Sequence, residues 1–575
     1  MPFDRKALSS VIDVARRRKA ADVLIKNAKI INVFSETIEE GNIAIAEGII
    51  AGIGAYEEGD TIYSVDGAFV SPGFIDSHMH IESTMLIPTE FAKAVVPLGT
   101  TTAIVDPHEI ANVAGIPGIQ FMINASKNLP IDVYFMLSSC VPATNLETSG
   151  ATLYAEDLAF LKNSDKVLGL AEVMNYPGVI NKDPELLDKI VLFRDSIIDG
   201  HSPTLSGYDL NAYLSAGILA DHECTTREEA LEKLSKGMWI MMREGSVTRD
   251  VLNLLPILND KTKHRLLICT DDKHPEDLIN EGHVNYAIRL LVENGVSLPL
   301  AVRLATLNPA LFFGFRRKGG VAPGYAADLV VFNDLKRMDL VFKDGTLVSK
   351  DSAPLFNVEE PVHVDAVKNT INLKQVTFEK LRILPRGKKI RVIGLTKNSV
   401  VTDELIFEPK VSDGVLVSDT ERDIIKIAVF ERHKATGKVA VGFIHGLGLK
   451  SGAFATSIAH DSHNIIVAGE NDKDMLLAIS QLESTGGGIA LAKNGAVLDY
   501  LALPYGGLMT NDSVYEVAEA LGRLHKVAHN DLGITYPDPF MALSFMHLAV
   551  IPKLKITDSG LVDVDKFEFV DLFVE

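Results

Sequence analysis

Cysteine is scarce in this sequence, and long apolar runs are absent. The 575 residues include three cysteines, Cys140, Cys224 and Cys269, and none of them belongs to a CxxC pair. An odd and sparse set of thiols argues against a disulfide framework and fits a reducing compartment. No stretch approaches the ~18 uninterrupted apolar residues of a membrane span, and the first residues lack the apolar core of a signal peptide. The sequence therefore predicts a cytoplasmic protein without a membrane partner.

Positive charge is also in deficit. Lysine and arginine number 56 against 76 aspartates and glutamates, which gives a formal net charge of −20. Such a chain repels phosphate backbones, so nucleic acid is not an expected partner. The hydrophobic fraction of 47% and the charged fraction of 23% are those of a folded globular protein and exclude wholesale disorder.

Apolar runs of strand length recur through the first half of the chain. Eight of them, from FVSPGFIDSH near residue 69 to RLLICTDD near residue 265, begin roughly 20–35 residues apart. That spacing is the length of one βα unit, and eight units over some 250 residues predict a (β/α)8 barrel. Short strand-and-turn patterns at 21–70 and 321–348 flank the barrel, so a small β domain built from both flanks is expected.

Strand-like runs return after residue 360, together with one clear helix near 513–528. They predict a further domain of the α+β class. The expected organisation is an N-terminal helix with the first part of the split β domain at 1–70, the barrel at 71–318, the return of the split β domain at 319–355, and the C-terminal α+β domain at 356–575.

Polar side chains follow the predicted barrel strands at their carboxyl ends, where barrels of this type build active sites. The sharpest case is His78-Met79-His80, because residues i and i+2 of a strand point to the same side and can hold one metal ion. Further candidates at strand ends are His108, Glu172, His201, His222 and Asp271.

These motifs carry a family resemblance. PGFIDSHMHIEST looks like the first-strand motif of the amidohydrolase superfamily, and LATLNPALFFGFRRKGGVAPGYAADLVVFN resembles its return into the split β domain. The segments DPHEIANVAG, LAEVMNYPGV, DGHSP, ADHE and CTDDKHP are similar to those of the adenine deaminases within that superfamily. The resemblance extends over nearly the whole chain, including a C-terminal domain that simpler amidohydrolases lack.

The resemblance implies two divalent metal ions. Their ligands would be His78, His80, Glu172, His201, His222 and Asp271. Glu172 stands where many relatives carry a carboxylated lysine, and its two oxygens can bridge a metal pair. The resemblance favours manganese or ferrous iron, and zinc also suits these nitrogen and oxygen ligands.

The activity implied is hydrolysis of adenine to hypoxanthine and ammonia, in purine salvage. Two metals can hold a hydroxide nucleophile at neutral pH, and Asp271 is expected to move its proton to the leaving amine. His108, Glu109 and Glu82 are candidates for protonating the purine ring, with His108 favoured because imidazole titrates near neutral pH. The alternatives are another aminopurine or cyclic amide as substrate, and a non-catalytic scaffold.

A second polar cluster, His460-Asp461-Ser462-His463-Asn464, lies in the C-terminal region. A plain polar turn is the simplest interpretation. The alternative hypothesis is that this domain covers the barrel mouth, with His460, Asp461 or His463 closing or polarising the substrate pocket. A small-molecule substrate and a homo-oligomer, with a dimer as first expectation, complete the predicted partners.

Overall fold

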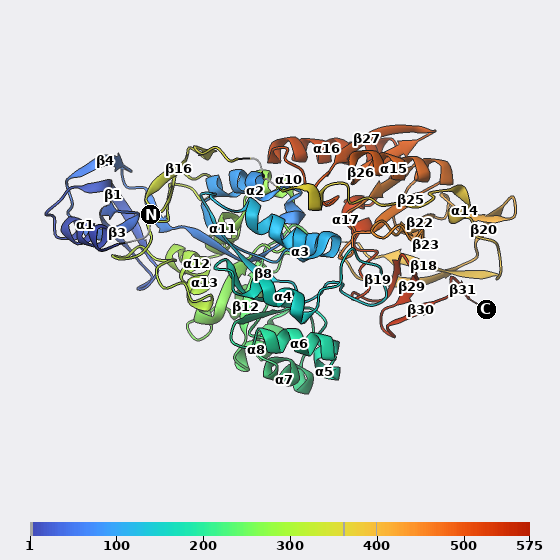
Figure 1. Ribbon diagram of the computed structural model, residues 1–575, viewed down its shortest axis with the longest axis horizontal. Coiled ribbons are helices and arrows are strands. Elements are labelled where there is room, and N and C mark those ends of the chain that lie inside the picture. The colour runs from blue at the N-terminus through green and yellow to red at the C-terminus, as the bar shows by residue number, and fades with distance from the viewer. Residues whose placement is uncertain (1–3, 360, 362, 398, 575) are drawn as a thin grey trace.

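The computed structural model describes residues 4–359, 361, 363–397 and 399–574. A β domain lies at one end of the elongated molecule, a barrel in the middle and a second α+β domain at the other end (Figure 1). The predicted fold class is confirmed. Among the described residues, no helix combines the length and the apolar character needed to cross a membrane.

Eight parallel strands form the barrel. Five pair in the order β10-β9-β8-β7-β6 and three in the order β11-β12-β13. Backbone hydrogen bonds join the two sets, from Leu219 N to Ile198 O at 3.0 Å and from Asp271 N to His78 O at 3.0 Å, so the barrel is closed. The strands are β6 (Phe74–Met79), β7 (Thr100–Val105), β8 (Asp132–Leu137), β9 (Val167–Val173), β10 (Ile197–Gly200), β11 (Ala220–Asp221), β12 (Trp239–Arg243) and β13 (Leu266–Cys269).

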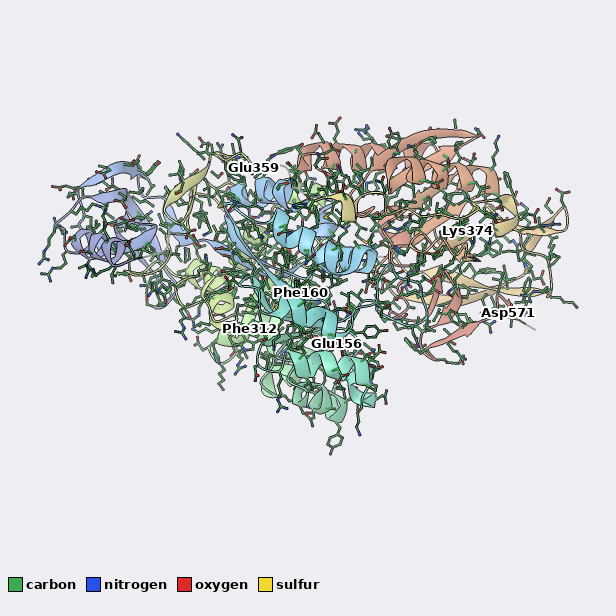
Figure 2. The ribbon with its side chains drawn as sticks, viewed as in Figure 1. Glu156, Phe160, Phe312, Glu359, Lys374 and Asp571 are labelled. Atoms are coloured by element: carbon green, nitrogen blue, oxygen red, sulfur yellow. The ribbon has the colours of Figure 1, made fainter. Side chains whose placement is uncertain are left out.

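Helices surround the barrel and bury one face each. In α11 (Val284–Glu293), for example, Val284, Ala287, Ile288 and Leu291 are buried at helical spacing. Other side chains point outward, such as Phe160 of α4, which is 76% exposed (Figure 2). The remaining helices of this layer are α2 (Pro88–Val95), α3 (His108–Ala125), α4 (Ala155–Lys162), α5 (Tyr176–Asn181), α6 (Pro184–Leu192), α7 (Gly207–Ser215), α8 (Arg227–Ser235), α9 (Val251–Leu254), α10 (Pro275–Asn280), α12 (Leu298–Leu304) and α13 (Leu307–Phe312).

The two flanking β segments form one sheet, because β5 pairs antiparallel with β14 through partners such as Val70 and Val331. The amphipathic helix α1 (Arg5–Ala15) packs on this sheet through Val11 and Val14. Its strands are β1 (Ala21–Asn32), β2 (Thr37–Ala46), β3 (Ile49–Gly54), β4 (Gly59–Ser64), β5 (Phe69–Pro72), β14 (Leu329–Phe332), β15 (Leu340–Lys343), β16 (Thr346–Lys350) and β17 (Ala353–Pro354).

The C-terminal domain is built on a second nine-stranded sheet of order β19-β18-β23-β22-β25-β24-β26-β27, with β31 beside β18. Its members are β18 (Lys389–Leu395), β19 (Thr402–Phe407), β22 (Ile424–Phe430), β23 (Val439–His445), β24 (Ala453–Thr456), β25 (Ile465–Gly469), β26 (Gly488–Lys493), β27 (Ala496–Ala502) and β31 (Phe573–Val574). Two small sheets accompany it, made of β20 (Lys410–Ser412), β21 (Val415–Val417), β28 (Leu554–Thr557), β29 (Gly560–Asp563) and β30 (Glu568–Val570).

The predicted helix near 513–528 is present as α16 (Val514–Asn530), capped by Ser513. Shorter helices are α14 (Phe378–Leu381) and α17 (Pro539–Ser544). Helix α15 (Asp472–Thr485) was not predicted, although its buried Met475, Ala478, Ile479 and Leu482 follow helical spacing. The helical pattern in the sequence is short, because four apolar residues form the buried face of α15 and a strand flanks the helix on each side.

The C-terminal domain packs against the carboxyl-end side of the barrel. Thr510 pairs with Leu86 just after β6, and α16 lies against α10. On the other side, the Asp558 carboxylate accepts hydrogen bonds from the backbone N–H and the hydroxyl of Thr148, at 2.8 and 2.7 Å. This packing brings the loop between β24 and β25, which contains HDSHN, over the barrel.

Candidate active site

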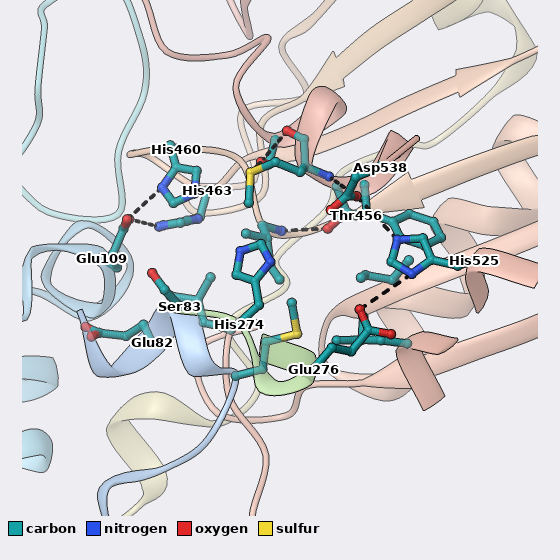
Figure 3. A pocket seen from close by; sticks show the side chains of 18 residues that line it. Glu82, Ser83, Glu109, His274, Glu276, Thr456, His460, His463, His525 and Asp538 are labelled. Atoms are coloured by element: carbon teal, nitrogen blue, oxygen red, sulfur yellow. Dashed lines mark hydrogen bonds and ion pairs between the residues drawn. The ribbon is translucent and has the colours of Figure 1, made fainter. Parts of the chain in front are cut away.

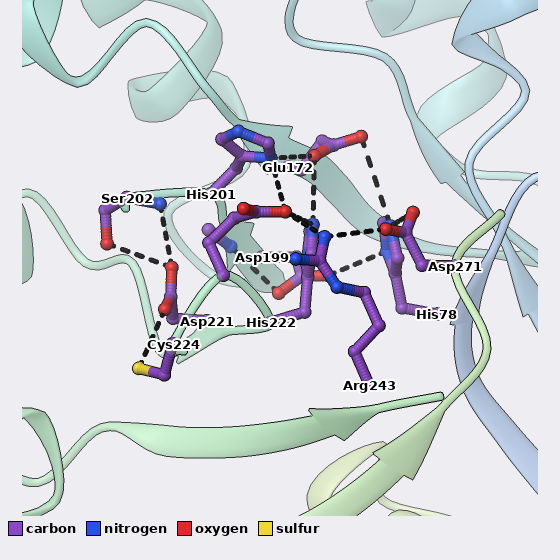
Figure 4. Close-up of polar contacts among 12 residues, drawn as sticks. His78, Glu172, Asp199, His201, Ser202, Asp221, His222, Cys224, Arg243 and Asp271 are labelled. Carbon is purple, nitrogen blue, oxygen red and sulfur yellow. Dashed lines mark hydrogen bonds and ion pairs between the residues drawn. The ribbon is translucent and has the colours of Figure 1, made fainter. Parts of the chain in front are cut away.

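Histidines and carboxylates from different strand ends meet at the carboxyl end of the barrel (Figure 4). His78 and His80, at the end of β6, are 1% and 3% exposed. Their Nε2 atoms lie 3.6 and 3.2 Å from the Oδ1 atom of Asp271, which follows β13. The strands β6 and β13 are neighbours in the closed barrel, and this adjacency explains why residues almost 200 positions apart in sequence touch.

Glu172, near the end of β9, lies between two groups of imidazoles. Its Oε1 atom is 3.4 Å from Nε2 of His80 and 3.4 Å from Nδ1 of His108. Its Oε2 atom is 2.8 Å from Nδ1 of His201 and 3.3 Å from Nε2 of His222. Each oxygen therefore faces its own pair of nitrogens, which is the arrangement of a carboxylate that bridges two positions.

The residues present fit a pair of divalent cations. Nε2 of His78 is buried among carboxylates and makes no hydrogen bond with the residues that the structure describes, which is costly for a polar atom unless a ligand completes it. Imidazole and carboxylate donors without thiolates suit manganese, iron and zinc alike. Ligand atoms lie within 4.8 Å of one another in several sets, including His78 with His222 and Asp271, and Glu172 with His201 and His222.

Residues that the sequence analysis missed hold these side chains in place. Asp199 of β10 lies 3.2 Å from Nδ1 of His78, so it turns the other nitrogen toward the centre of the cluster. The buried guanidinium of Arg243, the last residue of β12, donates to Oδ2 of Asp271 at 2.8 Å and also contacts Glu223. The signals were available: Asp199 stands two positions before His201, and Arg243 ends the seventh strand.

The three proton-donor candidates line two neighbouring cavities, and Glu109 lines both of them. His108 and Glu109 line a cavity of about 350 Å³ together with the metal-ligand candidates His80, Glu172, His201, His222 and Asp271. Asp106 lies 2.9 Å from Nδ1 of His108 and fixes its ring. Glu82 lines a smaller neighbouring cavity of about 50 Å³ instead (Figure 3). Its Oε1 atom accepts a hydrogen bond from the backbone of Ile110 at 3.1 Å.

The HDSHN loop reaches into the barrel mouth. Nδ1 of His460 lies 2.6 Å from Oε1 of Glu109, and Nε2 of His463 contacts Oε2 of the same carboxylate (Figure 3). Burial opposes a positive charge on His460, but the charge of Glu109 outweighs it and raises the pKa of His460 to about 9. The three side chains come from two domains, so Glu109 ties the C-terminal domain to the site.

This triplet has the composition of a metal site, but its hydrogen bonds indicate a different role. The backbone N–H of Ala459 donates to Nδ1 of His463 at 3.2 Å, so the proton of the neutral ring sits on Nε2 and is donated to Glu109. Burial lowers the pKa of His463 to about 4, which keeps the ring neutral. A nitrogen that carries a proton cannot bind a metal, and the triplet is therefore a hydrogen-bonded brace.

Comparison with known proteins agrees with this architecture. Residues 69–367 match the amidohydrolase family, and residues 399–568 match the adenine deaminase C-terminal domain. The chain is 50% identical to adenine deaminase 2 of Carboxydothermus hydrogenoformans, over 98% of this chain and 99% of that protein. It is 48% identical to the adenine deaminase of Kosmotoga olearia, over 98% of both chains, and 44% identical to that of Syntrophobacter fumaroxidans, over 100% of both.

Proposed function

We propose that this chain, which belongs to the amidohydrolase family and within it to the adenine deaminases, hydrolyses adenine to hypoxanthine and ammonia. The observation that carries the proposal is Glu172, whose two oxygens each face a separate pair of imidazoles in the cavity at the carboxyl end of the barrel. The cavity of about 350 Å³ is of the size that small-molecule sites have.

Two divalent cations, manganese or ferrous iron by family resemblance and zinc by ligand type, would be held by His78, His80, Glu172, His201, His222 and Asp271. Cations bound there supply Lewis acidity and make water a nucleophile at neutral pH. The protein contributes a fixed, buried donor set. Asp199 contacts the His78 ring, and Arg243 donates a hydrogen bond to Asp271. These contacts orient the two ligand side chains before substrate binds.

Asp271 and His108 would move the protons. Oδ1 of Asp271 lies beside the imidazole of His80, and Oδ2 accepts a hydrogen bond from Arg243. In this position Asp271 can take a proton from the attacking water and pass it to the leaving amine. His108 is oriented by Asp106, and its Nε2 atom lies 3.5 Å from Glu109. We assign His108 to protonation of the purine ring. Glu109, held as a carboxylate by two imidazoles, supports it.

Proton transfer and exclusion of water both depend on the loop from the C-terminal domain, and this dependence gives a prediction. His463→Ala removes one of the two hydrogen bonds that fix Glu109, and we expect kcat for adenine to fall about 10- to 100-fold. Bound metal, measured by atomic absorption, should be unchanged. His463→Gln, whose amide N–H can reach Glu109, should recover part of the loss. Unchanged kinetics in the alanine variant would leave the loop a plain turn.

A panel of candidate substrates tests which compound the protein hydrolyses. Purified protein loaded with manganese is mixed with adenine, guanine, 2,6-diaminopurine, a hydantoin and dihydroorotate, and ammonia release or ring opening is followed. We expect the largest kcat/KM for adenine. If a cyclic amide is turned over faster than adenine, adenine is not the preferred substrate. If metal-loaded protein turns over none of the compounds, the non-catalytic scaffold is favoured.

We also propose that the protein is cytoplasmic, which its scarcity of thiols supports. We further propose that it serves purine salvage and that it forms a homo-oligomer, with a dimer as the first expectation. Size-exclusion chromatography with light scattering tests the oligomeric state. A monomer at micromolar concentration would contradict it.

A further inference from the structure

A further carboxylate, that of Glu223, lies beside His201 and His222. Its Oε1 atom is 3.7 Å from Nδ1 of His201 and 3.7 Å from Nε2 of His222. These are the same two nitrogens that Oε2 of Glu172 faces. Glu223 lines the cavity of the metal-ligand candidates, and its side chain is 15% exposed. Each of the two nitrogens therefore has an oxygen of Glu172 and an oxygen of Glu223 close by.

These spacings suit ligands of a single cation. Imidazole nitrogens and carboxylate oxygens bind zinc at about 2.0–2.2 Å, so two ligand atoms of one such ion are at most about 4.4 Å apart. The distances from Glu172 and Glu223 to the two imidazole nitrogens lie between 2.8 and 3.7 Å. Glu223 thus lies as close to both imidazoles as a shared cation requires.

Glu223 also makes the two halves of the cluster alike. The imidazoles of the HMH motif have Asp271 beside them in addition to Glu172. Arg243 contacts both flanking carboxylates through Nη1, which donates to Oδ2 of Asp271 at 2.8 Å and to Oε1 of Glu223. Carboxylates that bind a metal commonly accept hydrogen bonds from outer groups, so this contact is compatible with metal binding. With Glu223, each half offers two imidazoles and two carboxylates.

Hydrogen bonds on both sides of Glu223 fix its backbone. The Asp221 carboxylate accepts hydrogen bonds from the backbone N–H of Ser202 at 2.7 Å and from the thiol of Cys224 at 3.2 Å (Figure 4). Lys233 donates to the same carboxylate at 2.9 Å. The chain before and after Glu223 is therefore tied to one buried group. A donor set held in this way can discriminate between cations, because selectivity depends on the number and the flexibility of the ligands.

A second carboxylate beside His201 and His222 changes which cation is preferred. Zinc generally binds sites of nitrogen and oxygen ligands more tightly than manganese or ferrous iron, so selectivity against zinc must come from ligand type and geometry. Zinc is satisfied by four ligands, of which three come from the protein in catalytic sites. Carboxylate and water oxygens suit manganese, which takes more ligands. An added carboxylate therefore favours manganese more than it favours zinc.

We propose that Glu223 is a further carboxylate ligand of the cation held between His201 and His222, and that it shifts the preference of this position from zinc towards manganese or ferrous iron. This inference rests on the proposed function, because it requires a pair of cations in the barrel. The alternative is that Glu223 serves only as an ion-pair partner of Arg243. In that case its loss should act on the metals no more than the loss of another partner of Arg243.

The test measures the stepwise dissociation constants of manganese and zinc. Protein stripped of metal with a chelator is titrated with each cation in a calorimeter, and bound metal per chain is counted by plasma mass spectrometry. We expect Glu223→Gln to raise Kd for one of the two manganese ions about 10- to 100-fold, the range for the loss of a group around a metal site. Zinc needs fewer ligands, and its constants should rise less than about threefold.

A shorter carboxylate separates ligation from charge. Glu223→Asp keeps the negative charge but withdraws the oxygens by one methylene group. If Glu223 is a ligand, Glu223→Asp should weaken manganese binding nearly as much as Glu223→Gln. If Glu223 acts only through its charge, Glu223→Asp should keep the wild-type constants, and the ligand role is wrong.

Asp250→Asn is the matched control. Asp250 is a second buried carboxylate beside Arg243, with its Oδ2 atom 3.5 Å from Nη2, and it does not line the cavity. Its substitution removes one charge from the surroundings of the same guanidinium and should leave the manganese and zinc constants unchanged. Circular dichroism and the thermal midpoint are recorded for every variant in the metal-free state, so that a loss of folding is not mistaken for a loss of a ligand.

Failure of this inference and failure of the proposed function give different results. If Glu223→Gln leaves the manganese constants unchanged, or if Asp250→Asn weakens manganese as much as Glu223→Gln does, Glu223 is not a ligand and the proposed function stands. If metal-loaded wild-type protein releases no ammonia from adenine, the proposed function fails, whereas the manganese and zinc constants still decide the role of Glu223.

Discussion

Glu172→Ala should abolish adenine turnover while the barrel still folds. The substitution removes both oxygens from a position where they face His80 and His108 on one side and His201 and His222 on the other. Replacement of residues that merely orient a ligand typically weakens metal binding 10- to 100-fold, so loss of a shared ligand should exceed about 100-fold. The measurement is metal content per chain by plasma mass spectrometry, alongside ammonia release.

A surface carboxylate provides the control for this variant. Glu156 on α4 is exposed, and Glu156→Ala should retain the wild-type metal content and rate. Far-ultraviolet circular dichroism should be the same for all three proteins. A Glu172→Ala protein with two metals per chain and a normal rate would refute the bridging role.

The fold could be predicted from the sequence because its signals are local. Each barrel strand is an apolar run of four to seven residues in most cases, bounded by turn residues and followed by a helix. The eleventh strand was the exception in length, since Ala220–Asp221 alone pairs with β12, yet the AGILADHE run marked its place. Helix α15 was missed because its short buried face looked like the strands on either side of it.

The residues of the candidate active site also differ in whether a local pattern in the sequence marks them. Residues that end strands could be predicted, because the barrel brings all strand ends to one face. The supports Asp199 and Arg243 were missed, since their role is defined by contacts to His78 and Asp271 across the barrel rather than by a pattern along the chain. The contact of His460 and His463 with Glu109 joins residues some 350 positions apart, and only the packing of two domains creates it.

Glu82 illustrates the limit of sequence proximity. It follows the HMH motif by two positions, yet it lines the smaller cavity with Met85, Leu508 and Phe540 rather than the cavity of the metal-ligand candidates. The 3-10 turn Ile81–Thr84 after β6 turns the chain away from the strand direction, so the period of two that joins His78 and His80 no longer holds at residue 82.

Asp271→Asn should separate metal binding from proton transfer. The amide keeps one oxygen that can face His78 and His80, so much of the metal should remain bound. An amide cannot act as a base near neutral pH, and we expect kcat to fall about 10²- to 10⁴-fold. The measurements are metal content and the steady-state rate of ammonia release at saturating adenine.

The partner of Asp271 supplies the matched variant. Arg243 donates to Oδ2 of Asp271 and is itself buried, so Arg243→Met removes the orienting hydrogen bond but leaves the carboxylate as a base. Its rate should fall less than that of Asp271→Asn. The double variant should be no slower than Asp271→Asn alone, because Arg243 acts through a carboxylate that is no longer there. If the two losses multiply instead, Arg243 acts on the substrate independently, and if Asp271→Asn turns over adenine at the wild-type rate, another residue is the base.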